Sequence, residues 1–265
     1  MANTATNTQK AGFSGLAGKR AVITGGAGGL AVATAMRLAA EGVKTAMVDL
    51  NLDGATAVAE KINAAGGDAS AFKVDVTSSA SVDKMFEDAA AKMGGVDILV
   101  TCAGGYKSYA NFEQIQEDDW DRVIALNLKS VFLCCKAALP YMKKNNWGRI
   151  INLGSIAGRS TSAGQSPAHY GTSKAGVSML TQYVAKDVAG YGITVNTVAP
   201  STTKTERVVN LMTPDKEAAF TKSTPMGRLA EPDDIVGIIV FLASEEARYI
   251  TGATYDVNGG RLMLV

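Results

Sequence analysis

Short apolar runs alternate with longer amphipathic segments along most of the chain. The short runs are rich in β-branched residues, whereas the longer segments repeat apolar residues every three to four positions. The runs predict about seven strands, over residues 20–24, 44–49, 70–76, 96–101, 149–153, 193–198 and 253–257. Several are apolar almost throughout, as strands are when helices cover both faces of a sheet. The alternation therefore predicts βαβ units and an α/β fold around one parallel sheet.

Two segments depart from this alternation. Residues 1–15 are small and polar, so we expect a flexible N-terminal tail ahead of a single domain over residues 16–265, within which the composition does not change. Residues 201–225 are rich in threonine and charge and show little periodicity. Because long loops in compact domains often act as lids or binding loops, we expect this segment to be a lid or a binding loop.

The composition of the chain argues against several classes of function. The 265 residues carry 26 basic and 25 acidic side chains without a long run of like charges, so nothing favours nucleic acid or an anionic membrane as a partner. The N-terminus lacks the apolar core of a signal peptide, and no stretch is apolar enough to span a bilayer, which predicts a cytoplasmic protein. The odd number of cysteines, with two adjacent, predicts reduced and mostly buried thiols at Cys102, Cys134 and Cys135.

A glycine-rich turn, TGGAGGLA at residues 24–31, follows the first predicted strand and leads into a helical pattern over residues 31–40. Glycines allow a tight turn and let a pyrophosphate approach the amides at a helix N-terminus, where the macrodipole favours negative charge. This context predicts a doubly wound sheet of the Rossmann type that binds a dinucleotide. The expected contacts of the turn with the cofactor are Gly25, Ala27, Gly28, Gly29 and Leu30.

A carboxylate ends the second predicted strand. Asp49 lies about twenty residues beyond the glycine turn, where a Rossmann fold places the acid that binds the adenosine ribose hydroxyls. Because a carboxylate repels a 2′-phosphate, we favour NAD over NADP; the alternative is an ordinary polar strand end. Asp75 ends the third predicted strand, where it could bind the adenine through its side chain or neighbouring backbone, or cap a helix.

Tyr170 and Lys174 open a helical pattern and are four residues apart, so they lie one turn apart on the same face. A free phenol has a pKa of about 10, and an ammonium ~5 Å away would stabilise the phenolate by ~3 kcal/mol, or roughly two pKa units. The pair would then be a usable acid and base near neutral pH. Because this spacing also arises by chance in many helices, the neighbouring motifs decide its meaning.

The order of motifs is similar to that of the short-chain dehydrogenase/reductase family from about Leu16 onward. That family combines TGxxxGxG, NAG, an Asn in a middle helix, a Ser after the fifth strand, YxxxK and a proline after the sixth strand. The corresponding features here are TGGAGGLA, TCAG at residues 101–104, Asn127, Ser155, Tyr170 with Lys174, and Pro200. The C-terminal part resembles 3-oxoacyl-carrier-protein reductases and sugar or polyol dehydrogenases.

The resemblance implies an oxidoreductase that moves a hydride between a nicotinamide cofactor and a secondary alcohol or ketone. Ser155 would hold the substrate oxygen and Tyr170 would transfer the proton. Lys174 would lower the pKa of Tyr170 and bind the nicotinamide ribose, and Asn127 would hold a water that connects Lys174 to solvent. Besides Tyr170 and Lys174, the implied contacts with the cofactor are Leu50, Val76, Ala103, Gly104, Pro200, Thr203 and Thr205.

Three positions differ from the family pattern. Ala31 stands where a third glycine is usual, which the broader Rossmann fingerprint tolerates. Cys102 replaces the Asn of NAG and removes an amide that would stabilise the ends of the central strands. Ser201 follows Pro200 where glycine is more frequent. None of these changes removes a group implied in catalysis.

The single histidine, His169, neighbours Tyr170 but points about 100° away from it on a helix, so we interpret it as structural or pocket-lining. No cluster has metal-ligand spacing, so no metal is expected. Substrate choice in the family depends on loops that correspond here to residues 105–111, 157–167 and 201–225. Their side chains, several of which are basic and could bind an anionic or acyl-carrier substrate or form a solvated rim, are Tyr106, Lys107, Arg159, Gln165, Lys204 and Arg207.

The resemblance also implies a homotetramer that acts on a small-molecule alcohol or carbonyl compound. Three alternatives stay open: an NADPH-dependent ketoreductase like the 3-oxoacyl-carrier-protein reductases, a nucleotide-sensing protein without turnover, and a methyltransferase. The methyltransferase has no use for Ser155, Tyr170 and Lys174 together.

Overall fold

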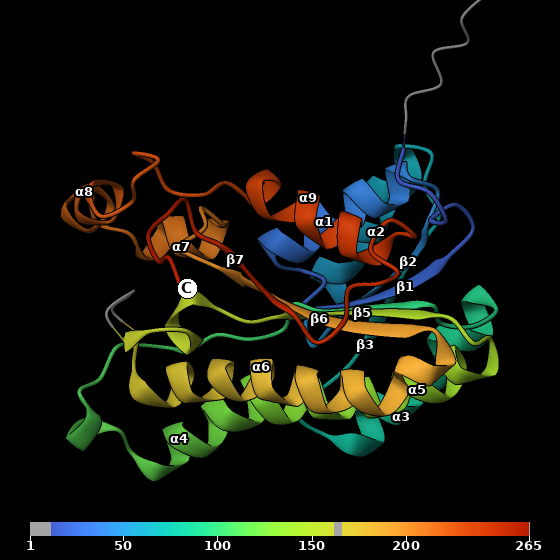
Figure 1. Ribbon diagram of the computed structural model, residues 1–265, viewed down its shortest axis with the longest axis horizontal. Helices are drawn as coiled ribbons and strands as arrows, with labels where there is room; N and C mark the ends of the chain where they lie inside the picture. The colour runs from blue at the N-terminus through green and yellow to red at the C-terminus, as the bar shows by residue number, and fades with distance from the viewer. Residues whose placement is uncertain (1–11, 162–165, 265) are drawn as a thin grey trace, which may run out of the picture.

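Seven parallel strands form one sheet in the order β3-β2-β1-β4-β5-β6-β7 (Figure 1). The computed structural model describes residues 12–161 and 166–264. Strand order reverses between β1 and β4, and ligands of open α/β sheets bind at such a switch point, beyond the carboxyl ends of the strands. The strands are β1 (Arg20–Thr24), β2 (Lys44–Asp49), β3 (Ala69–Lys73), β4 (Ile98–Thr101), β5 (Gly148–Leu153), β6 (Ile193–Pro200) and β7 (Thr254–Val257).

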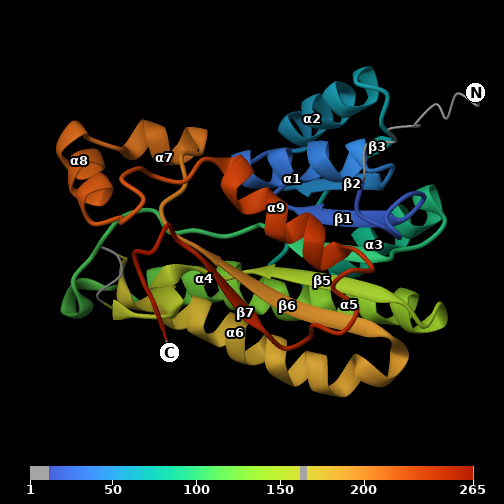
Figure 2. The ribbon, with the colours of Figure 1, turned by 45° about the horizontal axis from the view of Figure 1, so that its top comes forward.

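Helices cover both faces of the sheet (Figures 1 and 2). One face carries α1 (Gly29–Ala40), α2 (Leu52–Ala64) and α9 (Pro232–Ala243). The opposite face carries α3 (Ser79–Met93), α4 (Glu117–Ile124), α5 (Ser130–Lys144) and α6 (Ala168–Val188). The shorter α7 (Glu206–Leu211) and α8 (Pro214–Lys222) follow β6 and lie at one end of the sheet, to the left in Figure 1. The predicted doubly wound α/β fold is confirmed.

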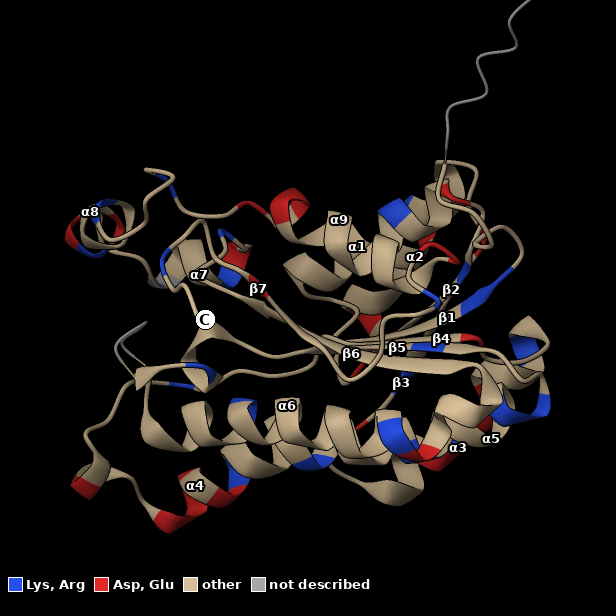
Figure 3. Ribbon diagram, in the orientation of Figure 1, with Lys and Arg blue, Asp and Glu red and all other residues tan. Residues whose placement is uncertain are grey.

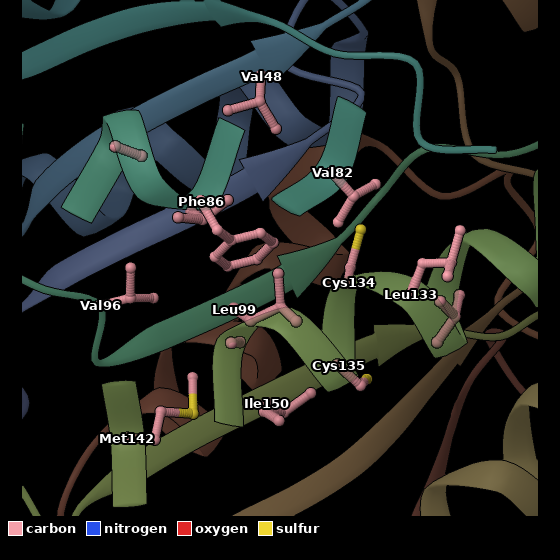
Figure 4. Packing of buried hydrophobic residues seen from close by; sticks show 14 of the residues in the cluster. Val48, Val82, Phe86, Val96, Leu99, Leu133, Cys134, Cys135, Met142 and Ile150 are labelled. Carbon is pink, nitrogen blue, oxygen red and sulfur yellow. The ribbon is translucent and has the colours of Figure 1, made fainter. Parts of the chain in front are cut away.

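The central strands contribute side chains to two separate hydrophobic cores, because successive side chains of a strand point to opposite faces of the sheet. In β1, Ala21 and Ile23 are buried with residues of α1, α2 and α9, whereas Val22 between them is buried with residues of α3, α5 and α6. Figure 4 shows the second core, in which Phe86 of α3 packs near Leu99 of β4. Burial on both faces explains why these strands are apolar almost throughout.

The predicted strand limits agree with the observed ones to within one or two residues, except at β3. The sequence predicted a strand over residues 70–76, but β3 ends at Lys73. The Asp75 carboxylate accepts hydrogen bonds from the Thr77 amide (2.9 Å) and hydroxyl (2.7 Å), which turns the chain, and Ser78 then caps α3. The polar residues at the end of this apolar run therefore belong to a turn and a helix cap.

Residues 201–225, which the sequence predicted to be a loop, contain α7 and α8. The Thr205 side chain caps α7 by accepting from the Val208 amide, and Thr213 caps α8 by accepting from the Lys216 amide, followed by Pro214 in the first turn. No side chain of α8 is buried. Without a buried face, such a helix has no apolar repeat, so its capping residues were the available signal.

The predicted N-terminal tail is partly attached to the fold. Residues 1–11 lie outside the described residues. The Phe13 amide donates to the Glu41 carboxylate (3.2 Å), and its ring lies 6.3 Å from the ring of Phe241 in α9. The Ser14 amide and hydroxyl both donate to Glu246 (3.0 and 2.8 Å).

The expectation that no stretch is apolar enough to span a bilayer was wrong in one place: the continuous helical stretch Glu117–Lys144 is long and apolar enough to cross a membrane by length and composition alone. Within its most apolar window, 44% is buried inside the protein, including Cys134 and Cys135. It packs against the sheet as a core helix does. In the view of Figure 3, basic and acidic segments are interspersed over the helices, in keeping with a net charge of +1.

Candidate active site

A cavity opens at the switch point, lined by residues that follow the ends of β1, β2, β3 and β4 together with Leu126 and Arg207. Of the residues predicted to bind the cofactor, those in its lining are Gly25, Gly28, Asp49, Leu50, Asp75, Val76, Ala103 and Gly104. The predicted cofactor residues outside this lining are Ala27, Gly29, Leu30, Tyr170, Lys174, Pro200, Thr203 and Thr205.

The glycine turn needs its glycines for close backbone approach. Gly25 has φ +69°, and a Cβ there would lie 2.9 Å from the amide nitrogen of Ala103. A Cβ on Gly26 would lie 2.8 Å from the amide nitrogen of Val48. Gly28 then caps α1, a helix of 12 residues whose N-terminal amides and macrodipole favour a phosphate. The chain's own geometry therefore fits a nicotinamide dinucleotide at this cavity.

Asp49 reaches from the end of β2 to the glycine turn. Its Oδ2 accepts from the Ala27 amide (3.1 Å) and its Oδ1 accepts from the Asn51 amide (2.9 Å). A carboxylate can accept about four hydrogen bonds, so each oxygen keeps one acceptor position facing the cavity that it lines. Asp49 thus fixes the turn and remains able to bind a hydroxyl pair.

Three residues at and after the end of β6 were also predicted to bind the cofactor. Pro200 ends β6, and Thr203 is buried in an isolated bridge with Ala230. Thr205 packs on the start of α1, since a Cβ on Gly29 would lie 3.0 Å from the Thr205 Cβ. These contacts place the beginning of α7 directly over the glycine turn.

Tyr170 and Lys174 lie one turn apart near the start of α6, as predicted. The Lys174 side chain is 4% exposed, and its Nζ donates to the Leu153 carbonyl at the end of β5 (2.6 Å). The same Nζ is 5.8 Å from the centre of the Tyr170 ring. The backbone of β5 therefore anchors the ammonium beside the phenol.

Ser155 is brought to this pair by close packing between the segment after β5 and α6. The Ser155 hydroxyl lies close enough to the Tyr170 phenol to lower its pKa, and it accepts from the Ala157 amide (3.1 Å). Behind it, a Cβ on Gly158 would lie 2.5 Å from backbone atoms of Lys174 and Ala175. Glycine at position 158 is therefore what lets Ser155 reach Tyr170, a signal that sequence analysis missed.

Asn127 lies in a π-helical turn, Ala125–Lys129, between α4 and α5, and such turns are frequent at functional sites. Its Nδ2 donates to the carbonyls of Gly105 (2.8 Å) and Val123 (2.9 Å), and its Oδ1 accepts from the Gly105 amide (2.7 Å). Both amide protons are therefore used, and only Oδ1 can bind a further donor. A Cβ on Gly104 would lie 2.7 Å from that Oδ1 and 3.3 Å from Lys174 Nζ, so both side chains converge on Gly104.

The electrostatics differ from the expectation that Lys174 lowers the pKa of Tyr170. Burial raises the pKa of the Tyr170 phenol, and the groups that oppose this rise are the Ser155 hydrogen bond and the charge of Arg207. Burial also lowers the pKa of Lys174 to about 8, so its charge is largely retained at pH 7 and is lost as pH rises above about 8. For the protein alone the expectation was wrong, because it counted the attraction between two charges and omitted the desolvation of both.

The three departures from the family pattern are accommodated locally. Ala31 is buried in the core beneath α1. Beside Cys102, the Thr24 hydroxyl accepts from the Ala103 amide (3.1 Å), and Thr101 donates to the buried Asn152 (3.0 Å), which holds the strand ends without an amide at position 102. Burial raises the pKa of the Cys102 thiol to about 12, so it stays protonated. The Ser201 backbone amide donates a hydrogen bond to the Val257 carbonyl.

His169 is fully buried, as expected for a structural residue. Its Nε2 is 2.9 Å from Asp119 Oδ2 of α4, and its ring stacks on Trp120 (6.4 Å between ring centres). Its Nδ1 has no hydrogen-bond partner among the described residues. His169 therefore ties the start of α6 to α4.

Two side chains of the predicted substrate loops lie closer to the phenol than their sequence positions suggested. The ring centre of Tyr106 lies 4.8 Å from that of Tyr170. Arg207 donates to the carbonyls of Gly104 (3.4 Å) and Tyr106, and its charge acts on the Tyr170 phenol. Nothing in the sequence distinguished Arg207 from the other basic residues of the loop.

The remaining loop residues differ in their surroundings. Arg159 forms a two-pronged ion pair with Asp256 of β7 (3.1 and 3.2 Å), and Lys204 pairs with Glu217 of α8 (2.8 Å). Lys107 is exposed, and Gln165 lies outside the described residues. Within residues 12–161 and 166–264, no three His, Cys, Asp or Glu side chains gather as metal ligands would.

Comparison with known proteins agrees with this geometry. The family described as Enoyl-(Acyl carrier protein) reductase matches residues 25–261. The chain is 40% identical over 245 residues to the 2,5-dichloro-2,5-cyclohexadiene-1,4-diol dehydrogenase LinX of Sphingobium indicum, covering 92% of this chain and 96% of that one. It is 37% identical over 247 residues to the 3-oxoacyl-[acyl-carrier-protein] reductase FabG of Escherichia coli K12, covering 93% and 98%.

Solved structures give the same result. The crystal structure of gox2181 superposes with a TM-score of 0.89 at 33% identity, covering 92% of this chain and 95% of that one. Levodione reductase superposes with a TM-score of 0.88 at 28% identity, covering 92% and 98%. With a family match over most of its length and relatives that align along nearly all of it, the protein belongs to the short-chain dehydrogenase/reductase family of oxidoreductases, which act on alcohol and carbonyl groups.

Proposed function

We propose that the protein transfers a hydride between NAD(H) and a secondary alcohol or ketone, with Tyr170 as general acid and base. The observation that carries the proposal is the convergence of three groups. Ser155 acts on the Tyr170 phenol and lowers its pKa, and the Lys174 ammonium is held 5.8 Å from the same ring by a backbone carbonyl. Packing brings these groups together from β5 and α6.

The chain's residues have distinct tasks in this mechanism. In alcohol oxidation, Tyr170 as phenolate takes the hydroxyl proton while Ser155 donates a hydrogen bond to the substrate oxygen. In ketone reduction, Tyr170 returns that proton. Lys174 holds its ammonium beside the phenol, where it binds the nicotinamide ribose, and Asn127 orients the Gly104–Gly105 backbone beside Lys174 and offers Oδ1 to a relay water. When bound, the nicotinamide ring supplies the acceptor or donor of the hydride.

NAD as the preferred cofactor rests on Asp49. The carboxylate lines the cavity and keeps acceptor positions for ribose hydroxyls, whereas a 2′-phosphate would bring two like charges together. Asp49→Asn keeps an oxygen acceptor and removes the charge. We expect the ratio of kcat/KM for NAD over that for NADP to fall by roughly tenfold or more, since one charged hydrogen bond is worth about 1.5–3 kcal/mol. An unchanged ratio would show that Asp49 does not select the cofactor.

An NADPH-dependent ketoreductase is the second candidate, favoured by the 37% identity with FabG, a 3-oxoacyl-[acyl-carrier-protein] reductase. LinX and levodione reductase instead carry the names of carbocyclic substrates, and the Tyr106 ring beside Tyr170 could contact such a ring. We therefore expect a carbocyclic secondary alcohol or ketone to be turned over better than a 3-oxoacyl thioester.

An absorbance assay at the reduced-nicotinamide band tests the proposal. NAD, NADP and their reduced forms are each combined with cyclic and linear alcohols, polyols, cyclic ketones and a 3-oxoacyl thioester. Turnover with NAD and an alcohol, or NADH and a ketone, is the expected result. Turnover of the thioester with NADPH alone would favour the second candidate. Binding of NAD without turnover of any compound would favour a nucleotide-sensing protein.

The remaining parts of the proposal concern the assembly and the location. We expect one catalytic domain over residues 16–265, assembled as a homotetramer. Support comes from the large apolar side chains of Phe132, Met179 and Tyr183, which are 46–66% exposed on α5 and α6. Light scattering should give four subunits, and fewer for Tyr183→Glu; a monomeric wild type would contradict it.

The free thiols Cys134 and Cys135, both buried, are in keeping with a reducing cytoplasm.

A further inference from the structure

Acidic side chains outnumber basic ones in the described lining of the cavity at the switch point. Asp49 and Asp75 both line it, and the hydrogen bonds from Thr77 together with the charge of Lys129 lower the pKa of Asp75, which keeps it ionised. Among the described residues that line the cavity, Arg207 is the one cation. Without it, the lining would have only acidic charges. A diphosphate carries negative charge as well, so beyond the amides at the start of α1, Arg207 is the one charged side chain of the described lining that would attract it.

Arg207 reaches this cavity from α7, whose first residues pack on the glycine turn through Thr205 and Gly29. The guanidinium lies against Gly105, where a Cβ would be 2.4 Å from a guanidinium nitrogen, and it donates to the carbonyls of Gly104 and Tyr106. Arg207 is exposed and has no carboxylate within ion-pairing distance among the described residues. Its charge is therefore balanced only by neutral carbonyls and solvent.

Hydrogen bonds between a guanidinium and a phosphate are shorter and roughly twice as strong as those to neutral acceptors, and the planar fork can bind two oxygens at once. An exposed arginine can change rotamer at little cost. Resting on the proposed function, we infer that Arg207 binds the diphosphate of the nicotinamide cofactor opposite the glycine turn, leaving the Gly104 and Tyr106 carbonyls as it does so. α7 then carries a part of the cofactor site that the family motifs do not mark.

Calorimetric titration of ligands that differ in the diphosphate tests this inference without reference to turnover. NAD and ADP-ribose contain the diphosphate, whereas adenosine does not. In Arg207→Gln, the Kd for NAD and for ADP-ribose should rise by about tenfold or more, and that for adenosine should stay within about twofold. Arg207→Lys should be intermediate, because it keeps the charge and loses the fork.

Arg248→Gln is the matched control, because Arg248 is also exposed and contacts only the Glu245 carbonyl among the described residues. It should bind all three ligands as the wild type does. Added salt should weaken NAD binding more in the wild type than in Arg207→Gln, because screening acts on the charge that was removed.

Each other outcome contradicts a defined part of the account. Equal NAD affinity in Arg207→Gln and wild type would overturn the inference and leave the proposed function standing. If that variant also showed a raised KM for an anionic substrate, Arg207 would be assigned to the substrate instead. Equal weakening of NAD and adenosine would show that Arg207 only supports the shape of the cavity. Failure of the wild type to bind NAD or NADP would overturn the proposed function together with this inference.

Discussion

The segment that carries Ser155, Tyr170 and Lys174 and the segment that forms α7 and α8 meet the same site but are built in opposite ways. The first is held by packing: Lys174 is 4% exposed, and Gly158 lets the chain after β5 contact the backbone of α6. The second is held at its ends. Thr205 and Thr213 cap its two helices, and α8 buries no side chain.

This difference separates the chemistry of the site from its selectivity. Proton transfer requires groups fixed to within fractions of an ångström, which buried packing and backbone hydrogen bonds provide. Binding different molecules requires a segment that can change without damage to the core, and an exposed segment meets that need. Substitutions of the same type in the two segments should therefore have very different effects.

The largest difference is expected from two serine-to-alanine changes. Ser155→Ala removes a hydrogen-bond donor to the developing charge and should lower kcat by about 10²–10³-fold. Because its hydrogen bond lowers the pKa of Tyr170, the change should also move the rising limb of alcohol oxidation to higher pH. Ser223→Ala at the end of α8, where the hydroxyl only donates to the Phe220 carbonyl (2.9 Å), should leave kcat and its pH profile unchanged.

These two variants are compared by steady-state kinetics over a range of pH. Ser155→Thr, which keeps the hydroxyl, should recover part of the lost rate. Comparable losses in Ser155→Ala and Ser223→Ala would contradict the separation of chemistry from selectivity.

Buried Lys174 should make stability depend on pH in alkaline solution. Its pKa is about 8 in the folded protein, below the ordinary value of 10.5, so the unfolded chain binds the proton more tightly. Folding is therefore penalised below pH ~8, and the penalty disappears as pH rises towards ~10.5. Relative to Lys174→Met, the free energy of unfolding of the wild type should rise by about 3 kcal/mol over this range.

Urea unfolding of both proteins at several pH values measures this difference, in which the titration of groups that do not interact with Lys174 cancels. Lys204→Met, in the exposed segment, is the control and should run parallel to the wild type. A wild type that loses stability relative to Lys174→Met as pH rises would mean that the ammonium is stabilised by the fold.

Two glycine-to-alanine changes give a smaller contrast, in stability as well as rate. Gly158→Ala forces a Cβ to within 2.5 Å of α6 backbone atoms, so it should cost about 1–3 kcal/mol and displace Ser155, with a loss of turnover. Gly237→Ala in the middle of α9 meets no heavy atom within 4 Å and should stabilise by about 0.5–1 kcal/mol. Thermal unfolding and kcat are measured for both, and an active, fully stable Gly158→Ala would show that this close contact is not needed.

The sequence predicted most of the sheet and the placement of Tyr170 and Lys174 on one helical face, because both depend on local patterns. Strands buried on two faces are apolar throughout, and Tyr170 and Lys174 are one helical turn apart whatever surrounds them. The end of β3 was missed because the turn at Asp75 follows an apolar run without a break.

Other features depend on contacts between distant parts of the chain, which no local pattern shows. The raised pKa of Tyr170 comes from burial beneath several segments, and the closeness of Gly158 to α6 exists only after folding. Arg207 lies against Gly104, which follows β4 about a hundred residues earlier in the chain. This contact forms only when α7 folds over the glycine turn. The helices α7 and α8 lack an apolar face, so capping by Thr205 and by Thr213 with Pro214 was their only mark.

The central claim is that Tyr170 transfers the proton, and Tyr170→Phe tests it most directly, because it removes one oxygen atom and keeps the ring. Two quantities are measured on the same preparation: kcat from absorbance of the reduced nicotinamide, and the Kd for NAD from calorimetry. The account predicts that kcat falls by about 10²–10⁴-fold or becomes undetectable, while the Kd changes by less than about threefold. A kcat close to that of the wild type would contradict the account.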